Sequence, residues 1–462
     1  MADTGGRIVV RSKNEMNMCD GPIFKKLIIY SLPLMATFVL QLVFNATDIA
    51  VLGILIGDDA VAAVGSTGAI INLMTCLFTG ISVGANVVVA RFAGAQNTEK
   101  ARKSVGCAVI SSLLFGGFLV IVGIISVRSI LVWTKCDPAV IDMAATYLKI
   151  YFLGMPVVML YNFCAAILRA VGDTKRPMIF LCIGGVINVV LNVFFILVCH
   201  MTVEGVAIAT VASQLVSAIL SLAVMFKEEG YSRLELGYLR IYKEEFFDML
   251  KIGIPSGIQT SMFSISNLLI QSAFNELGKT VMAGNTVASQ LDGFIYNAMY
   301  AVAAAAISFT GQNYGAGRID RIKKIMWRAM ILSAGVGMIV GGGVLLFDRE
   351  LCSIISDDPA VIEVACTRIL ILGGTYYLCG IMDVCSSIMR GLGKSVVATL
   401  VCLIGSCLFR ILWLETVYLL NPCVEMIYIV YPISWLLTIG IYLIIILPML
   451  NKLEKQYTPQ EI

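Results

Sequence analysis

The chain has 462 residues, of which 59% are hydrophobic and only 14% are charged. A soluble domain carries about 25% charged residues, so this composition excludes a soluble globular protein. The formal net charge of +3 is too small to indicate a nucleic-acid-binding protein. Continuous apolar runs of about 20 residues have the length of bilayer-spanning helices, whereas a β-barrel needs short alternating segments. The sequence therefore predicts an all-α membrane protein.

Hydropathy and loop residues divide the chain into twelve predicted transmembrane helices. They lie near residues 25–53, 59–90, 104–127, 138–168, 177–199, 204–226, 247–275, 281–312, 325–347, 359–389, 396–420 and 425–450. The polar residues 1–24 have no apolar core, so they are predicted to form a flexible cytoplasmic tail and not a signal peptide. Residues 228–246 are predicted to form a cytoplasmic linker, and residues 452–462 a C-terminal tail.

Lysine and arginine set the predicted orientation of these helices. With the N-terminus inside, 26 of the 33 Lys and Arg residues fall on the cytoplasmic side, four fall outside, and three lie within spans. Both termini are then cytoplasmic, which requires an even number of helices. We expect a multi-pass protein of the plasma (inner) membrane.

The chain contains an internal repeat with a constant offset between matching positions. The letters DPAVI occur at 137–141 and again at 358–362. Further identities at the same offset pair Gly94 with Gly315, Cys164 with Cys385, Arg169 with Arg390 and Gly184 with Gly405. We infer a duplication into an N-lobe, 25–227, and a C-lobe, 247–451. Because six helices per lobe is an even number, the lobes are predicted to be parallel repeats, an arrangement typical of alternating-access transporters.

The first predicted helix carries a polar stripe. Gln41, Asn45 and Asp48 share one helical face. A charge inside a span is costly and is a functional candidate by default. Asn188 and Asn192 lie one turn apart on helix 5. We predict that Asp48, Asn45, Asn188 and Asn192 bind the coupling ion, because a carboxylate removed from water can hold a proton near neutral pH. The alternative is that these side chains only hold helices together.

Other polar and aromatic residues within the spans are predicted to line a substrate pathway. Carboxylates beside aromatic rings suit an organic cation, although the tyrosines could equally be packing residues. The predicted pathway residues are Gln41, Asn72, Asn162, Asn267, Gln271, Asp292, Tyr296, Tyr300, Tyr376 and Asp383.

Three arginines near these spans are interpreted separately. Arg169 and Arg390 precede glycines at equivalent helix ends, and both are interpreted as structural helix stops. Arg410 could pair with Glu415 or with Asp383, and the sequence leaves both alternatives open.

Signatures of enzymes are absent from the sequence. His200 is the single histidine, no nucleotide-binding G-x-x-x-x-G-K-[ST] loop occurs, and the 14 cysteines form no C-x-x-C pair. We therefore predict no enzymatic activity, no cofactor and no metal centre, with Na⁺ at Asp48 as the one alternative.

Four stretches resemble the multidrug and toxic compound extrusion (MATE) family of transporters. They are GQNYGAGRIDRIKK at 311–324, its degenerate counterpart VARFAGAQN, the helix-1 segment FNATDIAVLG and the helix-10 segment GIMDVCSSIMRGLG. The likeness covers roughly residues 20 to 450. It implies a two-lobed, twelve-helix antiporter that expels organic cations or other xenobiotics in exchange for H⁺ or Na⁺.

The resemblance also implies roles for single residues. Asp48 matches the ion-binding acid of the N-lobe, Asn188 a supporting polar residue, and Asp383 the acid of the C-lobe. Some members carry an acid on helix 7 where this chain has Asn267, which leaves the coupling ion open.

Two rival functions remain. A flippase for lipids or lipid-linked oligosaccharides would favour a basic cleft for phosphates, whereas acids outnumber bases in the predicted cleft. A receptor or channel without coupled transport is disfavoured by the duplication. We expect a monomer that binds small, cationic, amphiphilic molecules within the lipid bilayer.

Overall fold

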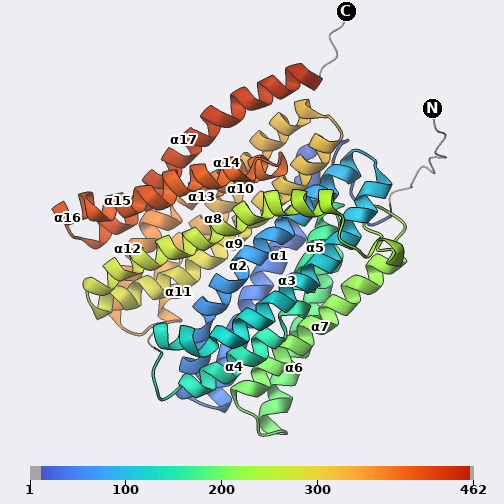
Figure 1. Ribbon diagram of the computed structural model, residues 1–462. Coiled ribbons are helices and arrows are strands. Elements are labelled where there is room, and N and C mark those ends of the chain that lie inside the picture. The colour runs from blue at the N-terminus through green and yellow to red at the C-terminus, as the bar shows by residue number, and fades with distance from the viewer. Residues whose placement is uncertain (1–11, 135, 458–462) are drawn as a thin grey trace, which may run out of the picture. The chain divides into compact units, whose positions relative to one another are not determined.

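The computed structural model describes residues 12–134 and 136–457, and within these ranges all regular secondary structure is helical (Figure 1). The helices of the first half are α1 (Ile23–Leu55), α2 (Asp58–Gly94), α3 (Thr98–Trp133), α4 (Ile141–Leu153), α5 (Met155–Ala170), α6 (Lys175–Leu197) and α7 (Val203–Lys227). After the short turn η1 (Leu236–Tyr238), the second half contains α8 (Lys243–Glu276), α9 (Lys279–Gly315), α10 (Ile319–Leu346), α11 (Asp348–Ser353), α12 (Pro359–Arg368), η2 (Ile369–Gly373), α13 (Tyr376–Gly391), α14 (Ser395–Cys402), η3 (Leu403–Leu408), α15 (Phe409–Glu415), α16 (Val417–Leu420) and α17 (Val424–Tyr457). The segments η2 and η3 are π-helices.

The helical segments account for the twelve predicted spans. In the described residues, nine helices are long and apolar enough to cross a membrane. The number rises to eleven when two bent pairs, α4 with α5 and α12–η2 with α13, each count as one span. The remaining long helix is α8, with 34 residues. It is less apolar because polar residues such as Thr260 and Asn267 lie along it. The chain is a multi-pass helical membrane protein.

Helix bounds repeat with the offset seen in the sequence. Helices α2 and α9 begin and end at positions related by the offset that separates the two DPAVI motifs, and so do α5 and α13. After α5 and α13 the chain turns at Gly172 and Gly393, whose φ values are +99° and +71°. Glycine adopts this left-handed conformation without steric cost and ends a helix in a defined way. The duplication is therefore seen in the positions of the helices as well as in the amino-acid sequence.

Contacts within the chain define two compact units. Unit 1 contains residues 43–253 and the segment before residue 20, and unit 2 contains residues 20–42 and 254–462. Helices α1 and α8 are each divided between the units. The predicted lobe boundaries at 25–227 and 247–451 stay a prediction.

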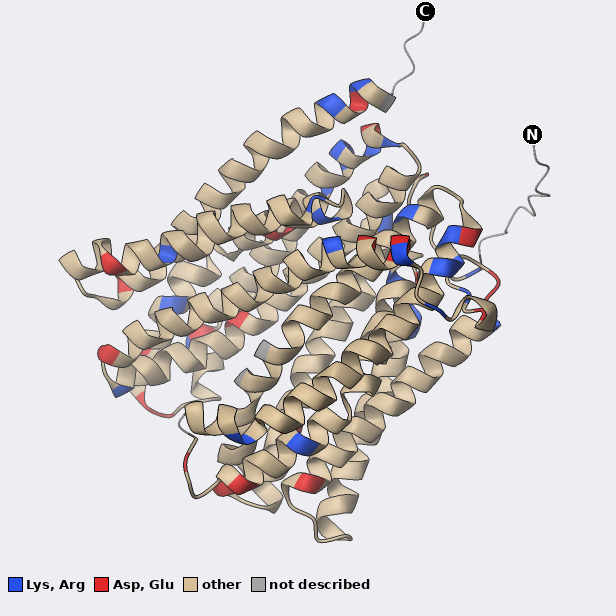
Figure 2. Cartoon of the chain, viewed as in Figure 1, with Lys and Arg blue, Asp and Glu red and all other residues tan. Residues whose placement is uncertain are grey.

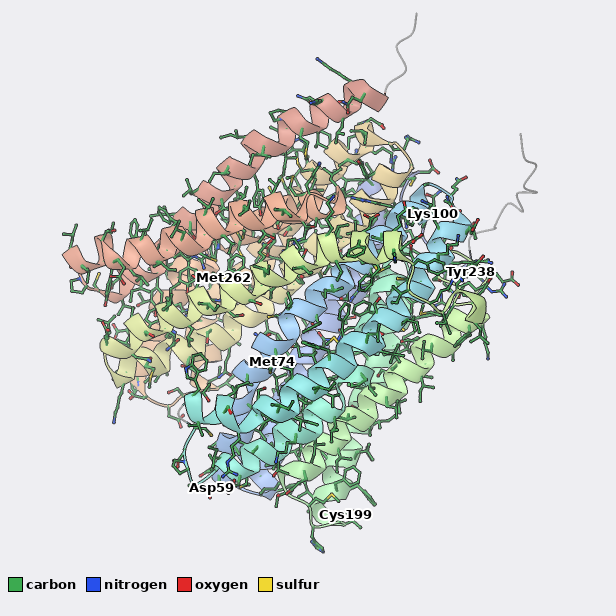
Figure 3. All side chains as sticks on the ribbon, viewed as in Figure 1. Asp59, Met74, Lys100, Cys199, Tyr238 and Met262 are labelled. Atoms are coloured by element: carbon green, nitrogen blue, oxygen red, sulfur yellow. The ribbon has the colours of Figure 1, made fainter. Side chains whose placement is uncertain are left out.

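Within unit 1, successive loops lie at opposite ends of the bundle. Figure 3 shows Asp59 and Cys199 at one end and Lys100 and Tyr238 at the other. Figure 2 shows that Lys, Arg, Asp and Glu concentrate near helix ends and loops, with long uncharged stretches between them. On α3, Leu114, Ile121 and Ile125 are 56 to 76% exposed, which suits contact with lipid chains.

The segment before α1 packs against unit 1 where the sequence predicts a flexible tail. Glu15 is buried and accepts hydrogen bonds of 3.3 Å from the backbone N–H and the hydroxyl of Ser232. The N–H of Met16 donates to the carbonyl of Val171. At the other end, α17 continues to Tyr457, into the predicted C-terminal tail. The rest of the two predicted tails, 1–11 and 458–462, lies outside the described residues.

Candidate functional site

The first polar site lies in unit 1, where α1 and α6 approach closely. A Cβ atom at Gly185 of α6 would overlap the ring of Phe44 on α1. A glycine at this position lets the two helices pack closely, as small residues do between membrane helices. Asp48 lies one turn beyond Phe44, and Asn192 lies two turns beyond Gly185. The close approach therefore brings the carboxylate of α1 to the amides of α6.

Asp48 is the end of a short hydrogen-bonded chain. The amide of Asn192 donates to Asp48 Oδ1 at 2.6 Å and lies 3.4 Å from Asn188 Oδ1. The amide of Asn188 in turn lies 3.4 Å from the hydroxyl of Thr210 on α7. Asn192 is fully buried, and its Oδ1 atom has no partner among the described residues. A carboxylate and unpaired amide oxygens are ligands that a proton or a hard cation can use.

Apolar and aromatic side chains pack beside this chain. Leu52, one turn beyond Asp48, belongs to a buried cluster with Tyr147 and Val206. Tyr151 packs on the same cluster and stacks on Tyr147 at 6.2 Å between ring centroids. This packing shields the Asp48 site on one side.

Three other residues predicted in the first half form no hydrogen bond with Asp48 within the described residues. Asn45 and Asn72 are exposed. Asn162 donates 2.9 Å to the carbonyl of Val158 on its own helix, α5. The ion site predicted at Asn45 and the pathway positions predicted at Asn72 and Asn162 stay predictions.

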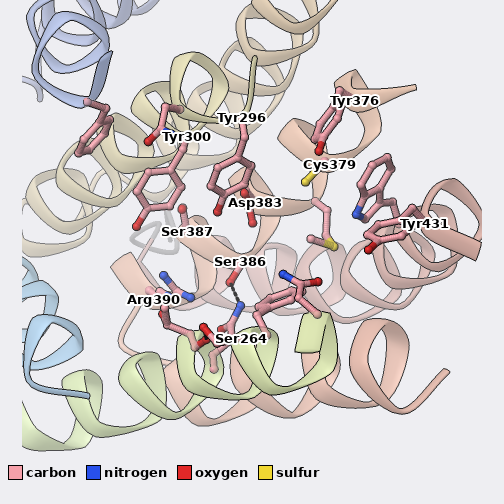
Figure 4. Close-up of a pocket in the computed structure, with 18 of the residues that line it drawn as sticks. Ser264, Tyr296, Tyr300, Tyr376, Cys379, Asp383, Ser386, Ser387, Arg390 and Tyr431 are labelled. Carbon is pink, nitrogen blue, oxygen red and sulfur yellow. Dashed lines mark hydrogen bonds between the residues drawn. The ribbon is translucent and has the colours of Figure 1, made fainter. Parts of the chain in front are cut away.

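The second site is a cavity of about 510 Å³ within unit 2 (Figure 4). It is formed by the first part of α1 together with α8, α9, α13, α15 and α17. Six predicted pathway residues line it: Gln41, Asn267, Tyr296, Tyr300, Tyr376 and Asp383. The other lining residues are Phe38, Gln259, Thr260, Phe263, Ser264, Asn297, Cys379, Met382, Ser386, Ser387, Arg390, Arg410, Tyr431 and Trp435.

Aromatic rings and few charges characterise this cavity. Tyr296 and Tyr300 stack at 5.7 Å, and Phe38 lies 5.5 Å from Tyr300. Figure 4 shows Asp383 beside Tyr296. The charged lining residues are Asp383, Arg390 and Arg410, so the bases outnumber the acid. The sequence predicts the opposite balance for the cleft, because the prediction places Asp292 among the acids of the cleft.

Asp292 lies outside the cavity lining, in a buried ion pair. Its Oδ2 atom is 2.7 Å and 2.8 Å from two nitrogens of Arg368. Arg368 also donates to the side chain of Asn285, which donates 3.0 Å to Gln271. Asp292 and Gln271, both predicted to lie in the pathway, are thus parts of one hydrogen-bonded network. The guanidinium compensates the charge of Asp292.

Arg410 pairs with neither of the two predicted partners. Its Nε donates 3.0 Å to the hydroxyl of Ser434, and its guanidinium lies 4.3 Å from the ring centroid of Tyr431. Glu415 is five positions away on α15, which puts it on nearly the opposite helix face. No ion pair joins Arg410 to Glu415 or Asp383 within the described part of the chain.

Several lining residues are missed by reasoning from the sequence. Arg390 is interpreted there as a helix stop, and α13 does end at Gly391, but the side chain also lines the cavity. Tyr431 and Trp435 are four positions apart on α17, a spacing that marks one helix face. That spacing indicates in the sequence that the two rings share a helix face. Only the packing of α17 against the other helices shows that this face lines the cavity.

Two units built from a repeated six-helix pattern, each with a polar site inside the membrane region, define a helical membrane transporter with internal repeats. The MatE family model matches this chain twice, over residues 33–194 and 255–413. The two matches cover more than half of the chain and coincide with the duplication. The chain belongs to the MatE family of multidrug and toxic compound extrusion transporters.

Curated relatives align over most of their length. The probable multidrug resistance protein YoeA of Bacillus subtilis is 26% identical over 378 residues, which cover 80% of this chain and 82% of that protein. The probable multidrug resistance protein NorM of Thermotoga maritima is 26% identical, with 81% of each chain covered. The multidrug export protein MepA of Staphylococcus aureus is 21% identical, with 85% of this chain and 87% of that protein covered.

Solved structures share the fold. A MOP superfamily transporter from Pyrococcus furiosus, described as having a binding pocket of reverse polarity, superposes with a TM-score of 0.89 at 20% identity, over 96% of this chain and 99% of that one. An outward-facing multidrug resistance MATE family transporter also gives a TM-score of 0.89 at 20% identity, over 96% of this chain and 100% of that one. At these identities the likeness concerns the fold alone.

Proposed function

We propose that this protein is a secondary active antiporter that exports drugs and other small organic compounds in exchange for H⁺ or Na⁺ by alternating access. Family membership supports this proposal, and so do the curated relatives whose names describe multidrug resistance or export. The observation that carries it is the hydrogen bond of 2.6 Å between Asn192 and Asp48. This bond holds a carboxylate inside a helix bundle. A charge in that position costs free energy, so a carboxylate there is a candidate functional group.

In this proposal Asp48 binds the coupling ion. A proton would neutralise the carboxylate directly. A Na⁺ ion would use oxygen atoms of Asp48 together with Asn192 Oδ1, which has no hydrogen-bond partner among the described residues. Either ion removes the negative charge from the interior, so the loaded and empty states differ in electrostatic energy.

The cavity of unit 2 holds the organic substrate. Its volume suits a drug-sized molecule, and the stacked Tyr296 and Tyr300 offer aromatic surfaces. Organic cations, the class predicted from the sequence, would meet one carboxylate, Asp383, and two arginines in this lining.

The first prediction concerns Asp48→Asn. The amide keeps an acceptor for Asn192 and preserves the fold, but it cannot take up a proton or neutralise a cation. We expect a drug-sensitive strain producing this variant to be as sensitive as a strain without the gene, at equal protein levels. Growth inhibition across a panel of cytotoxic compounds measures this.

The matched control is Asp59→Asn, which changes an exposed carboxylate at one end of the same unit. We expect it to keep the resistance of the wild type. Adding a proton ionophore or a sodium ionophore to the wild-type strain identifies the ion whose gradient drives export. Resistance that survives in Asp48→Asn would remove Asp48 from the coupling mechanism.

A flippase for lipids or lipid-linked oligosaccharides is the second candidate. One observation favours it, since the unit 2 cavity contains two arginines, and guanidinium groups bind phosphates well. Flipping of a fluorescent anionic lipid in liposomes by the purified protein, in the absence of drug export by cells, would support this candidate.

The remaining proposals concern the setting of the protein. The distribution of Lys and Arg supports cytoplasmic termini, and the plasma (inner) membrane is proposed as the location. A monomer is proposed because a two-lobed repeat protein of this size can hold its transport pathway within one chain. Mass measurement of the detergent-solubilised protein tests the oligomeric state.

A further inference from the structure

Arg390 is a buried cation of the unit 2 cavity with no ion-pair partner among the described residues. Its side chain is only 7% exposed, and its Nε atom has no hydrogen-bond acceptor in the same part of the chain. Figure 4 shows Arg390 at one end of the cavity, on the same side as Ser387 and Tyr300. The guanidinium therefore offers unused donors to whatever occupies that end.

Arg410 adds a second cation to the same lining. It is 3% exposed, and its contacts, with the hydroxyl of Ser434 and the ring of Tyr431, are to neutral groups. Figure 4 places Tyr431 at the end of the cavity opposite Arg390. Both ends of the cavity thus carry a positive charge. Neither charge has a carboxylate as an ion-pair partner in the described part of the chain.

Asp383 is the one acid in the described lining and lies between these ends, beside Tyr296. It forms an ion pair with neither arginine, and one carboxylate can balance only one of two guanidinium charges. Arg368 provides the contrast within the same unit, since Asp292 pairs with it at 2.7 Å. Within its described residues, unit 2 thus pairs the buried Arg368 and leaves the two arginines that face the cavity unpaired.

The lining has one more positive than negative side chain, and an anion entering the cavity relieves the cost of burying this excess charge. The planar guanidinium matches carboxylate, sulfonate and phosphate oxygens, to which it can donate two parallel hydrogen bonds. The nearby Tyr300 and Phe38 rings would contact an aromatic or apolar body attached to such a group.

We propose that the unit 2 cavity binds an organic oxyanion, an aromatic or amphiphilic molecule whose carboxylate, sulfonate or phosphate group lies on Arg390. This inference rests on the proposed transport function and names the chemical class of its substrate. Arg410 contributes positive potential at the far end, and Asp383 opposes binding of the anion when it is ionised.

Binding to the purified protein in a non-ionic detergent tests this without any ion gradient. The probes are 2-naphthalenesulfonate, the matched cation (2-naphthyl)trimethylammonium, and dihexanoyl phosphatidate as a lipid phosphate. Isothermal titration calorimetry measures each dissociation constant. We expect the sulfonate to bind more tightly than the ammonium compound of the same size.

Variants assign the binding to Arg390. A charge-assisted hydrogen bond contributes enough that Arg390→Gln should weaken sulfonate binding by about tenfold or more. Arg390→Lys should retain part of the affinity, and Lys394→Gln, an exposed basic residue nearby, should leave it unchanged. Asp383→Asn should strengthen sulfonate binding, whereas a cation site would show no such gain.

Tighter binding of the ammonium compound by the wild type would overturn the proposal. So would equal sulfonate affinity in the wild type and a folded Arg390→Gln variant. Arg390-dependent binding of phosphatidate but not of sulfonate would support an oxyanion site whose source is a lipid. Because no gradient is involved, loss of drug resistance in Asp48→Asn and the outcome of these titrations are independent of each other.

Discussion

At the scale of single residues, the buried arginines of unit 2 have different surroundings and therefore different roles. Arg368 is paired with Asp292 and bonded to Asn285, so its charge is compensated. Arg390 and Arg410 face the cavity without a carboxylate partner among the described residues. A paired buried charge stabilises a structure only while both partners remain, whereas an unpaired one beside a cavity can bind a ligand.

The prediction at this scale is that Asp292→Asn destabilises the protein. It leaves the Arg368 charge uncompensated in a buried position, a loss of about 3–5 kcal/mol for a broken buried pair. Thermal unfolding in detergent should show a clearly lower midpoint. The double variant Asp292→Asn with Arg368→Met removes both charges and should recover much of the loss.

Asp383→Asn is the matched control, since Asp383 has no ion-pair partner among the described residues. It should unfold at a temperature close to that of the wild type. An Asp292→Asn protein with wild-type stability but altered ligand binding would instead support the pathway role predicted from the sequence.

At the scale of helices, the repeated units use the same close contact. A Cβ atom at Gly184 on α6 would overlap Ser217 on α7, and one at Gly405 in η3 would overlap Thr438 on α17. Gly405 and Thr438 are the repeat equivalents of Gly184 and Ser217. Small residues at these crossings let neighbouring membrane helices pack closely. The duplication has therefore kept a packing contact as well as the order of the helices.

The two units differ at the same place in another respect. Helix α6 is a regular α-helix throughout, whereas the corresponding part of unit 2 contains the π-helix η3 just before Arg410. A π-helical turn contains more residues than an α-helical one, so the side chains that follow it point in a different direction. The direction of Arg410 toward the cavity therefore could not be predicted from the regular repeat.

We predict that Gly405→Val destabilises the protein. The added side chain must displace Thr438 or push α17 away, and overpacking of this kind costs about 1–3 kcal/mol. Gly440→Val on α17 is the control, because nothing among the described residues lies within 4 Å of a Cβ atom there. The two variants should differ in thermal unfolding midpoint, with only Gly405→Val lowered. Equal midpoints would show that the helix contact tolerates the larger side chain.

At the scale of the whole molecule, each unit is completed by segments that are distant in sequence. Within the described residues, unit 1 includes residues 12–19, and unit 2 includes residues 20–42, which contain the first part of α1. In unit 1, Glu15 lies beside Ser232 and the backbone of Gly230 in the linker between α7 and α8. Burial raises the pKa of Glu15, and the nearby Glu228 raises it further.

This pKa shift predicts a pH dependence for the packing of that segment. With a pKa raised by folding, Glu15 binds its proton more tightly in the folded state, so packing is favoured at low pH. Ionisation of Glu15 destabilises the packed segment. This destabilisation begins as the pH rises past the ordinary pKa of 4.5 and is complete above the raised pKa of the folded state. Amide hydrogen exchange of residues 228–235, corrected for intrinsic rates, should therefore be slower at pH 5 than at pH 8.

Glu15→Gln should largely remove that difference, because the amide cannot ionise. The control Glu229→Gln changes an exposed neighbour and should keep the wild-type pH dependence. Protection that is greater at pH 8 in the wild type would contradict the role given to Glu15.

Much of the molecule follows from the sequence alone. The twelve helices and the duplication are confirmed, because hydropathy and the constant offset between matching positions are local and repeated signals. The polar stripe around Asp48 is also visible in the letters, since a charge within an apolar run is costly wherever it points. Its partnership with Asn192 depends on how closely α1 approaches α6 at Gly185.

The tertiary structure decided what helical periodicity leaves open, namely which faces meet and which charges pair. Asp292 and Arg368 are 76 positions apart, and their ion pair removes from the cavity an acid that the sequence counts as part of it. Arg390 is interpreted from the sequence as a helix stop, whereas in the structure its side chain lines the cavity. The net charge of a binding site comes from side chains on several packed helices. It therefore cannot be read from the sequence of any single helix.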